Sequence, residues 1–384
     1  MTSDLSTAVI PSVDPATAGI DERRIDRLAS LIESHIERGW YPGAAIAMAR
    51  NSQLILHREF GHARIETEFG AAQQATPNTR WLLYSQTKPI FTSVVWMLIE
   101  DGLLRFHDRI AEYVPEFARH GKEDITLAQV LAHQGGFPNA TVGAEAWEDH
   151  ELMRELVCDF RLDWAPGTKL EYHGASAHWV QAMLIEAVTD QDYRNVVKER
   201  LLTPLGLADV HVGVPDAHHE ALAGAYRGGP EGPYEPMAER NGPEFWRAGV
   251  PGGGGYATAV GVTTFYQMLL AGGVLNGTRV LGPRTIEYVT RNHTGDLTDE
   301  RFGMPMHRGL GVHVRGLTPL IRGLGSTASP RTFGHGGVGT SYTWADPETG
   351  VSFTYLTNSQ LEEPLHSQRL DEVMVMAHAA VVTL

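Results

Sequence analysis

The hydrophobic residues in the first part of the chain follow two different patterns. In the segment 20–38 they recur at helical spacing, which predicts an amphipathic helix. The apolar face of this helix consists of Ile25, Leu28, Leu31, Ile32 and Ile36. The segments 43–50 and 54–61 are apolar, strand-like runs separated by Asn51-Ser52-Gln53, and they predict a β-hairpin.

A further apolar run, residues 89–99, is hydrophobic around most of a helix circumference. This pattern is typical of a helix buried in the middle of a domain. Tyr84-Ser85-Gln86-Thr87-Lys88 leads directly into the run. Ser85 and Lys88 are three residues apart, so they are expected on one face of the first turn.

The rest of the chain passes from helical patterns back to strand patterns. Helices are expected at 125–133, 179–188, 193–202 and 364–382, and the segment 227–251, rich in Gly, Pro and aromatic residues, is expected to be a loop beside a cleft. Short runs rich in β-branched and aromatic residues predict strands at 309–315, 331–338, 340–345 and 351–357.

Strands at both ends with helices between them predict an α+β fold, an α/β sandwich whose antiparallel sheet is built from both termini. We expect an N-terminal extension at 1–19 and a sheet domain formed by 20–84 and 249–384. A mainly helical domain is expected at 85–248, with the active site at the interface between the two domains.

Composition and charge narrow the possible partners. The chain has 384 residues with a formal net charge of −15, which argues against a nucleic-acid or anionic-membrane partner. Cys158 is the only cysteine, so no internal disulfide or thiol metal cluster is expected. We expect Cys158 to be buried as a small hydrophobic residue. Residues 1–19 lack the features of a secretory signal, and no later stretch has the ~18 apolar residues of a membrane span. A cytoplasmic location follows as an expectation.

Ser85 and Lys88 are the candidate chemical groups. Burial disfavours a charged ammonium, so a desolvated Lys88 could take the proton of the Ser85 hydroxyl. A helix N-terminus also favours negative charge developing near Ser85. Ser-x-x-Lys alone is a weak signal. Of the four lysines, however, only Lys88 leads a buried-looking helix and has a serine three residues before it.

Several other motifs, spread from about residue 20 to 380, agree with one family. They are Glu100-Asp101-Gly102-Leu103-Leu104, Asp108-Arg109-Ile110, Ile125-Thr126-Leu127, Pro166-Gly167-Thr168 before Tyr172, Pro204-Leu205-Gly206-Leu207, Pro251-Gly252-Gly253 and His335-Gly336-Gly337. With these motifs the chain resembles the serine β-lactamase and penicillin-binding-protein superfamily. In particular, it resembles the class-C-like branch, with family VIII-type esterases, D-aminopeptidases and acyltransferases.

The resemblance implies further site residues. The family's Tyr-x-Asn motif corresponds to Tyr172-His173-Gly174, and its Lys-Thr-Gly motif to His335-Gly336-Gly337. The family's oxyanion hole, made of two backbone N–H groups, corresponds to Ser85 and Val338. Two simpler interpretations stay open: Tyr172 could only pack in the cleft, and His335 could be a structural strand residue.

Two departures from the family bear on the substrate. Gly174 removes the amide that would bind an acylamino side chain, and His335 replaces a permanent cation that would face a substrate carboxylate. Both departures weaken the case for β-lactams. Gly336 and Gly337 would let a substrate approach the strand closely.

Other chemistries find little support in the sequence. The segment 334–339 contains Gly-x-Gly-x-x-Gly, but a strand-like run follows where a dinucleotide fingerprint needs a helix. Neither Gly-x-Ser-x-Gly nor His-Glu-x-x-His occurs. We therefore expect no cofactor and no metal ion.

The expected function is a serine hydrolase that cleaves small carboxylic esters through an acyl-enzyme on Ser85. Lys88 and Tyr172 would share the acid–base work, and which of them takes the first proton stays open. The alternatives are an acyltransferase, a D-aminoacyl peptidase, a weak β-lactamase or a decayed binding protein. The partner would be a small ester or acyl substrate; the acyl acceptor and the oligomeric state stay open.

Overall fold

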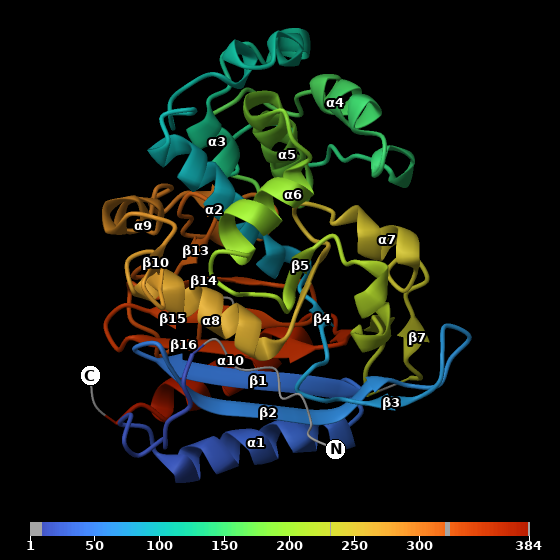
Figure 1. The fold of residues 1–384 in the computed structure, drawn as a ribbon, viewed down its shortest axis with the longest axis vertical. Helices are drawn as coiled ribbons and strands as arrows, with labels where there is room; N and C mark the ends of the chain where they lie inside the picture. Colours follow the sequence, from blue (N-terminus) through green and yellow to red (C-terminus); the bar gives the residue numbers. More distant parts are fainter. Residues whose placement is uncertain (1–9, 231, 319–322, 383–384) are drawn as a thin grey trace.

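The structure is a computed structural model that describes residues 10–230, 232–318 and 323–382 (Figure 1). Within this part, seven strands form one antiparallel sheet in the order β13-β14-β15-β16-β1-β2-β3. The strands are β1 (Gly43–Arg50), β2 (Gln53–Arg64), β3 (Gln73–Gln74), β13 (His313–Val314), β14 (Phe333–Gly336), β15 (Tyr342–Asp346) and β16 (Val351–Thr357).

The sheet joins the two ends of the chain, as the α+β prediction requires. The central pair is β1 with β16, in a register that runs from Ala44 opposite Thr357 to Arg50 opposite Val351. The hairpin of β1 and β2 and the strand β16 confirm the sequence-based expectation. Ten residues of the predicted N-terminal extension, 10–19, are described, and they include the buried Ile10; residues 1–9 lie outside the described part.

Helices cover both faces of the sheet, and the alternation of β1 side chains explains this. Ala44, Ile46 and Met48 belong to one hydrophobic cluster with α1 (Glu22–Glu37) and α10 (Leu365–Ala379). The residues between them, Ala45, Ala47 and Ala49, belong to the cluster that contains α8 (Ala259–Leu270). Side chains of a strand alternate between faces, so β1 is buried on both.

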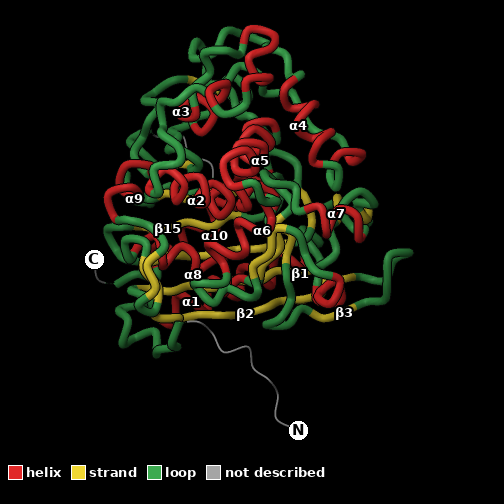
Figure 2. The backbone as a smooth tube through the Cα atoms, turned by 45° about the horizontal axis from the view of Figure 1, so that its top comes forward, coloured by secondary structure: helices red, strands yellow, loops and turns green. Residues whose placement is uncertain are grey.

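A mainly helical region lies beside the sheet, with α3, α4 and α5 at the end of the molecule away from β1 and β2 (Figures 1 and 2). Its centre is α2 (Thr87–Glu100), whose residues 87–98 are all buried, as its apolar circumference predicts. The remaining α-helices of the described residues are α3 (Leu127–Leu131), α4 (His150–Cys158), α5 (Ser176–Thr189), α6 (Tyr193–Val197) and α7 (Pro243–Ala248), together with α9 (Pro283–Val289) later in the chain. The domain boundaries at residues 84/85 and 248/249 stay a prediction.

Short strands form small additional sheets. One of them, in the order β4-β8-β5, lies next to the start of the helical region. The short strands are β4 (Trp81–Leu82), β5 (Val210–Val212), β6 (Tyr226–Arg227), β7 (Glu235–Pro236), β8 (Gly255–Ala257), β9 (Val274–Leu275), β10 (Thr278–Arg279), β11 (Thr298–Asp299), β12 (Met304–Pro305) and β17 (Ser359–Gln360).

Two local predictions are wrong for identifiable reasons. The segment 309–315 is a strand only at His313–Val314. Its first part bonds to helices instead, because the Leu310 N–H donates to Val289 O and the Leu310 carbonyl accepts from Trp96 Nε1. The segment 227–251 contains α7, whose Pro243 stands at the first helical position, where proline favours a helix.

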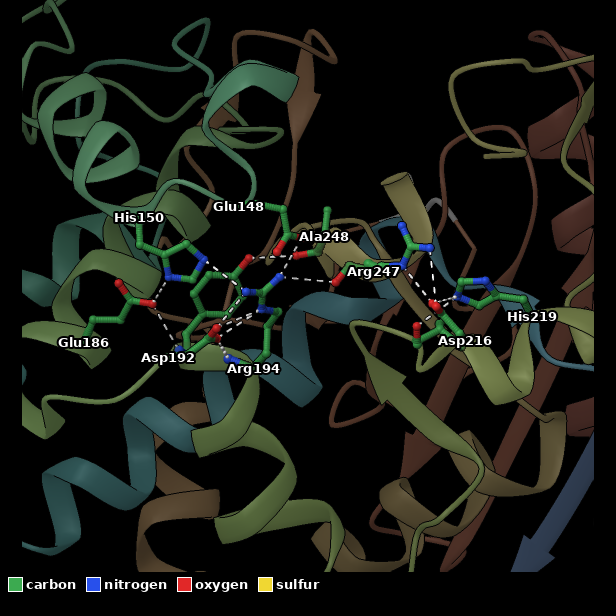
Figure 3. A network of polar contacts seen from close by, with 11 residues as sticks. Glu148, His150, Glu186, Asp192, Arg194, Asp216, His219, Arg247 and Ala248 are labelled. Atoms are coloured by element: carbon green, nitrogen blue, oxygen red, sulfur yellow. Dashed lines mark hydrogen bonds and ion pairs between the residues drawn. The ribbon is translucent and has the colours of Figure 1, made fainter. Parts of the chain in front are cut away.

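A network of ion pairs and hydrogen bonds connects α4, α5, α6 and α7 (Figure 3), and α7 joins it through the Arg247 carbonyl, which accepts from Arg194 Nη1. Arg194 donates to Asp192 at 2.7 Å and to Glu148 at 2.9 Å, while His150 Nδ1 lies 2.6 Å from Glu186 Oε1. Ligand atoms of His150, Glu186 and Asp192 lie within 4.8 Å of one another. Arg194 contacts His150 and Asp192 directly. Its guanidinium therefore supplies positive charge beside the carboxylates of this network.

Two smaller observations complete the fold. Cys158 is buried, as the sequence predicts, and its Sγ contacts Met183 Sδ at 3.8 Å. Among the helices of the described ranges, none is long and apolar enough to cross a membrane.

Candidate active site

Ser85, Lys88 and Tyr172 meet at one point although Tyr172 is 87 residues from Ser85 in the sequence. The Tyr172 hydroxyl lies 2.8 Å from Ser85 Oγ, and Lys88 Nζ lies 3.2 Å from the same oxygen. The hydroxyl of Ser85 is thus within proton-transfer distance of two titratable groups.

Ser85 is positioned by a tight turn at the start of α2. It lies in a 3₁₀ segment, Tyr84–Gln86, that continues directly into the helix. Tyr84, immediately before it, has a φ of +47°, in the left-handed region that non-glycine residues rarely adopt. Its carbonyl accepts a hydrogen bond from Thr87 Oγ1 at 2.7 Å. The turn is therefore held in a strained conformation, as is common beside reacting groups.

Lys88 is completely buried, and its amine is surrounded by oxygen atoms. It donates to the carbonyl of Gly174 at 2.7 Å and to the carbonyl of Gly252 at 2.6 Å. Burial, followed by the charges of Arg308 and Arg301, lowers the pKa of Lys88 to about 7. A neutral amine has two hydrogens, which suffice for the two carbonyls and leave its lone pair for the Ser85 hydroxyl.

Tyr172 is held by a buried ion pair. Its backbone N–H donates to Asp299 Oδ1 at 3.2 Å, and Asp299 Oδ2 accepts from Arg308 Nη2 at 2.6 Å. The Arg308 guanidinium lies 4.8 Å from the centre of the Tyr172 ring. Burial raises the pKa of Tyr172 to about 12, although its hydrogen bond with Ser85 and the two arginines act in the opposite direction. The phenol therefore stays protonated near neutral pH.

His335-Gly336-Gly337, the third motif, begins on β14, and the ring of His335 lies near that of Tyr172. The His335 ring centre is 6.0 Å from that of Tyr172 and 3.9 Å from that of His313, and the two imidazole planes are tilted by 33°. His335 Nδ1–H donates to the Gly336 carbonyl at 2.9 Å. Burial and the nearby Lys88 hold the pKa of His335 well below its usual value, so the ring is neutral.

The end of β14 also packs against the residues that precede Ser85. A Cβ added at Gly337 would lie only 2.9 Å from Leu83 O and 3.2 Å from the Tyr84 Cβ, so this position requires close backbone approach. The next residue, Val338, is exposed, and among the described residues its N–H finds no acceptor. A free backbone donor is thus available next to the Ser85 turn.

Comparison with known proteins identifies the family. The model of the Beta-lactamase family matches residues 28–375. The chain belongs to this family. Esterase/beta-lactamase LipL of Mycobacterium tuberculosis (strain ATCC 25618 / H37Rv) is 29% identical over 314 residues, which are 74% of this chain and 70% of LipL. The match confirms the family resemblance of the motifs and makes this chain a serine hydrolase.

Solved structures agree on the fold. A penicillin-binding-protein homologue from Caulobacter crescentus superimposes with a TM-score of 0.80 at 24% identity, covering 94% of this chain and 99% of that one. A family VIII carboxylesterase superimposes with a TM-score of 0.76, also at 24% identity, covering 93% and 98%. These likenesses confirm the predicted fold class.

Some residues of the site were not expected from the sequence as site residues. Gly252 belongs to one of the sequence motifs, and a Cβ at this position would lie 3.0 Å from Lys88 Nζ and 3.1 Å from His178 Cβ, so a larger residue would crowd the amine. The run of four glycines at 252–255 was the available signal. Asp299 and Arg308 gave no signal, because their contacts with Tyr172 are made across the fold.

Buried histidines line the back of the site. The His133 ring centre is 4.8 Å from that of Tyr172, and His133 Nδ1 accepts the His173 N–H at 3.2 Å. His178 Nε2 lies 3.2 Å from Thr92 Oγ1, and its Cβ would touch any side chain at Gly252. Burial holds the pKa of all three rings below its usual value. They are therefore neutral and add no charge beside Lys88.

Proposed function

We propose that this serine hydrolase cleaves small carboxylic esters through an acyl-enzyme on Ser85. The single observation that carries the proposal is the position of Ser85 Oγ between Lys88 Nζ and the Tyr172 hydroxyl, at 3.2 and 2.8 Å. A nucleophile within reach of a base and an acid is the arrangement that acyl transfer needs.

The opposite pKa shifts of the two partners support separate roles. Lys88, with a pKa of about 7, is the base that takes the Ser85 proton as Oγ bonds to the ester carbonyl. Tyr172, with a pKa of about 12, is the acid that protonates the departing alcohol as the C–O bond breaks, and Lys88 then returns its proton to Tyr172. Water then attacks the acyl-enzyme by the same steps. Lys88 takes a proton from the water, Tyr172 protonates Ser85 Oγ as the acyl–oxygen bond breaks, and the carboxylic acid is released.

Two backbone donors would stabilise the negative oxygen of the intermediates. We assign these donors to the N–H groups of Ser85 and Val338. The free Val338 donor and the packing of Gly337 against the Ser85 turn support this assignment. The acyltransferase alternative shares the same acylation and differs only in the acceptor, so product analysis with added alcohols or amines separates it from hydrolysis.

The preference for esters rests on what the site lacks. His335 is neutral, so the third motif offers no cation to the carboxylate of a β-lactam, and Gly174 offers no side-chain amide. The neighbour that is named a family VIII carboxylesterase supports ester hydrolysis, whereas LipL is named both an esterase and a beta-lactamase and supports either substrate.

We expect kcat/KM for 4-nitrophenyl butyrate to exceed that for a chromogenic cephalosporin by at least about 100-fold, because unmatched polar groups of a substrate are strongly discriminated against. Both rates are measured by absorbance in the same buffer, with Ser85→Ala as the control that should abolish both. Faster hydrolysis of the cephalosporin would reverse the proposed substrate ranking.

A further inference from the structure

Arg301 lies at the wall of the site, in the turn between β11 and β12. Its guanidinium carbon is 5.9 Å from the centre of the Tyr172 ring. Its Nη1 would be 3.8 Å from a Cβ placed on Gly174, the residue whose carbonyl binds Lys88. The guanidinium therefore stands beside the space that a side chain at position 174 would occupy.

The backbone of Arg301 is tied to that of Tyr172 by one carboxylate. Asp299 Oδ1 accepts the N–H of Arg301 at 3.1 Å and the N–H of Tyr172 at 3.2 Å. The Glu300 N–H donates to Leu170 O at 2.9 Å, which joins the same two segments a second time. The turn is thus a fixed part of the site wall and holds Arg301 in a defined place relative to Tyr172.

The two arginines near Tyr172 differ in charge balance. Arg308 is buried and neutralised by Asp299 at 2.6 Å. Arg301 is exposed, and among the described residues no carboxylate forms an ion pair with its guanidinium. An arginine stays charged at any working pH. In a chain of net charge −15, this leaves an unbalanced positive charge at the mouth of the site.

We propose that Arg301 determines specificity by binding a carboxylate of the substrate, so that the preferred substrates are small esters carrying a carboxylate group. This inference rests on the proposed ester hydrolysis. A planar guanidinium suits a carboxylate because it can donate two parallel hydrogen bonds. The charge sits on the Tyr172–Gly174 wall and not on the strand of the third motif, where His335 is neutral.

The test compares charged esters with uncharged analogues of the same shape. One pair carries the group on the acid side: monoethyl glutarate and its carboxamide, ethyl glutaramate. The other carries it on the alcohol side: 3-(butanoyloxy)propanoate and its carboxamide. The two pairs distinguish the two possible sources of the carboxylate. Rates are measured at about pH 8.5, above the Lys88 pKa of about 7, so that a small change of that pKa has little effect.

For the wild-type protein we expect kcat/KM for one carboxylate ester to exceed that of its carboxamide by about tenfold, the scale of a charge-assisted hydrogen bond. Arg301→Gln should remove this preference while leaving the carboxamide rate within about twofold, and Arg301→Lys should restore part of it. The preference should fall with added salt. Arg161→Gln, which changes another exposed arginine, is the matched control and should keep the preference.

Three outcomes would overturn the inference. Equal rates for each ester and its carboxamide would show that the site does not select a carboxylate. An equal loss on all four esters in Arg301→Gln would show that Arg301 acts through Lys88 or Tyr172 instead. If the wild-type protein hydrolyses none of these esters or 4-nitrophenyl butyrate, the proposed function itself fails, and the inference fails with it.

Discussion

Replacing Lys88 by arginine should lower kcat for ester hydrolysis by a factor on the order of 10² to 10⁴, the usual contribution of a general base. Arginine keeps the positive charge and can donate to the carbonyls of Gly174 and Gly252, but it does not deprotonate. Steady-state kinetics with a nitrophenyl ester, together with thermal unfolding to show that the variant is folded, measure the effect.

The chain offers a matched control for this variant. Lys122 is also buried, its Nζ donates to the carbonyls of Arg119, Cys158 and Phe160, and burial lowers its pKa to about 8. Since it contacts no group of the site, Lys122→Arg should change stability and leave kcat near normal. Near-normal turnover in a folded Lys88→Arg protein would rule out Lys88 as the base.

The pH dependence of the wild-type protein should report the same group. Lys88 acts as a base only when neutral, and its pKa is about 7. Lys88 therefore gains a proton below that pH, and kcat/KM should fall as the pH decreases through about 7. In Lys88→Arg this inflection should be absent from the residual activity.

Replacing Tyr172 by phenylalanine should lower kcat/KM by a factor on the order of 10² or more, because the acid that protonates the leaving alcohol is lost. The loss should be larger for an ethyl ester than for a nitrophenyl ester, since nitrophenolate departs without a proton. The value of kcat/KM is measured for the wild-type protein and for Tyr172→Phe, each with the ethyl ester and the nitrophenyl ester.

The matched control for this second variant is Tyr193→Phe. Tyr193 is buried and its hydroxyl donates to the Ala248 carbonyl at 2.9 Å, away from Ser85. This change should leave both rates near normal. A Tyr172→Phe protein with an equal, small loss on both esters would mean that Tyr172 only packs in the cleft.

Much of the fold could be predicted because its signals are local. The buried helix α2, the β1–β2 hairpin and the strand β16 show in the spacing of apolar residues alone. The segment 309–315 could not be predicted, because Leu310 bonds to α2 and to the end of α9, which only the folded chain brings close.

The residues of the candidate site also differ in whether the sequence predicts them. Ser85 and Lys88 were found from their spacing at one helix end, and Tyr172, His335 and Val338 only from the family resemblance. Asp299 gave no signal, because the residue that it holds, Tyr172, lies 127 positions away in the sequence. The neutral state of His335 likewise follows from burial, which the sequence does not state.

The most direct test of the account asks whether Ser85 is the activated nucleophile. A phosphonate ester resembles the tetrahedral intermediate and reacts only with a nucleophile that is activated and placed beside oxyanion donors. We expect intact-mass spectrometry to find one adduct per chain, peptide mapping to place it on the peptide containing Ser85, and Ser85→Ala to show none. An adduct on a different serine, or an adduct that persists in Ser85→Ala, would contradict the account.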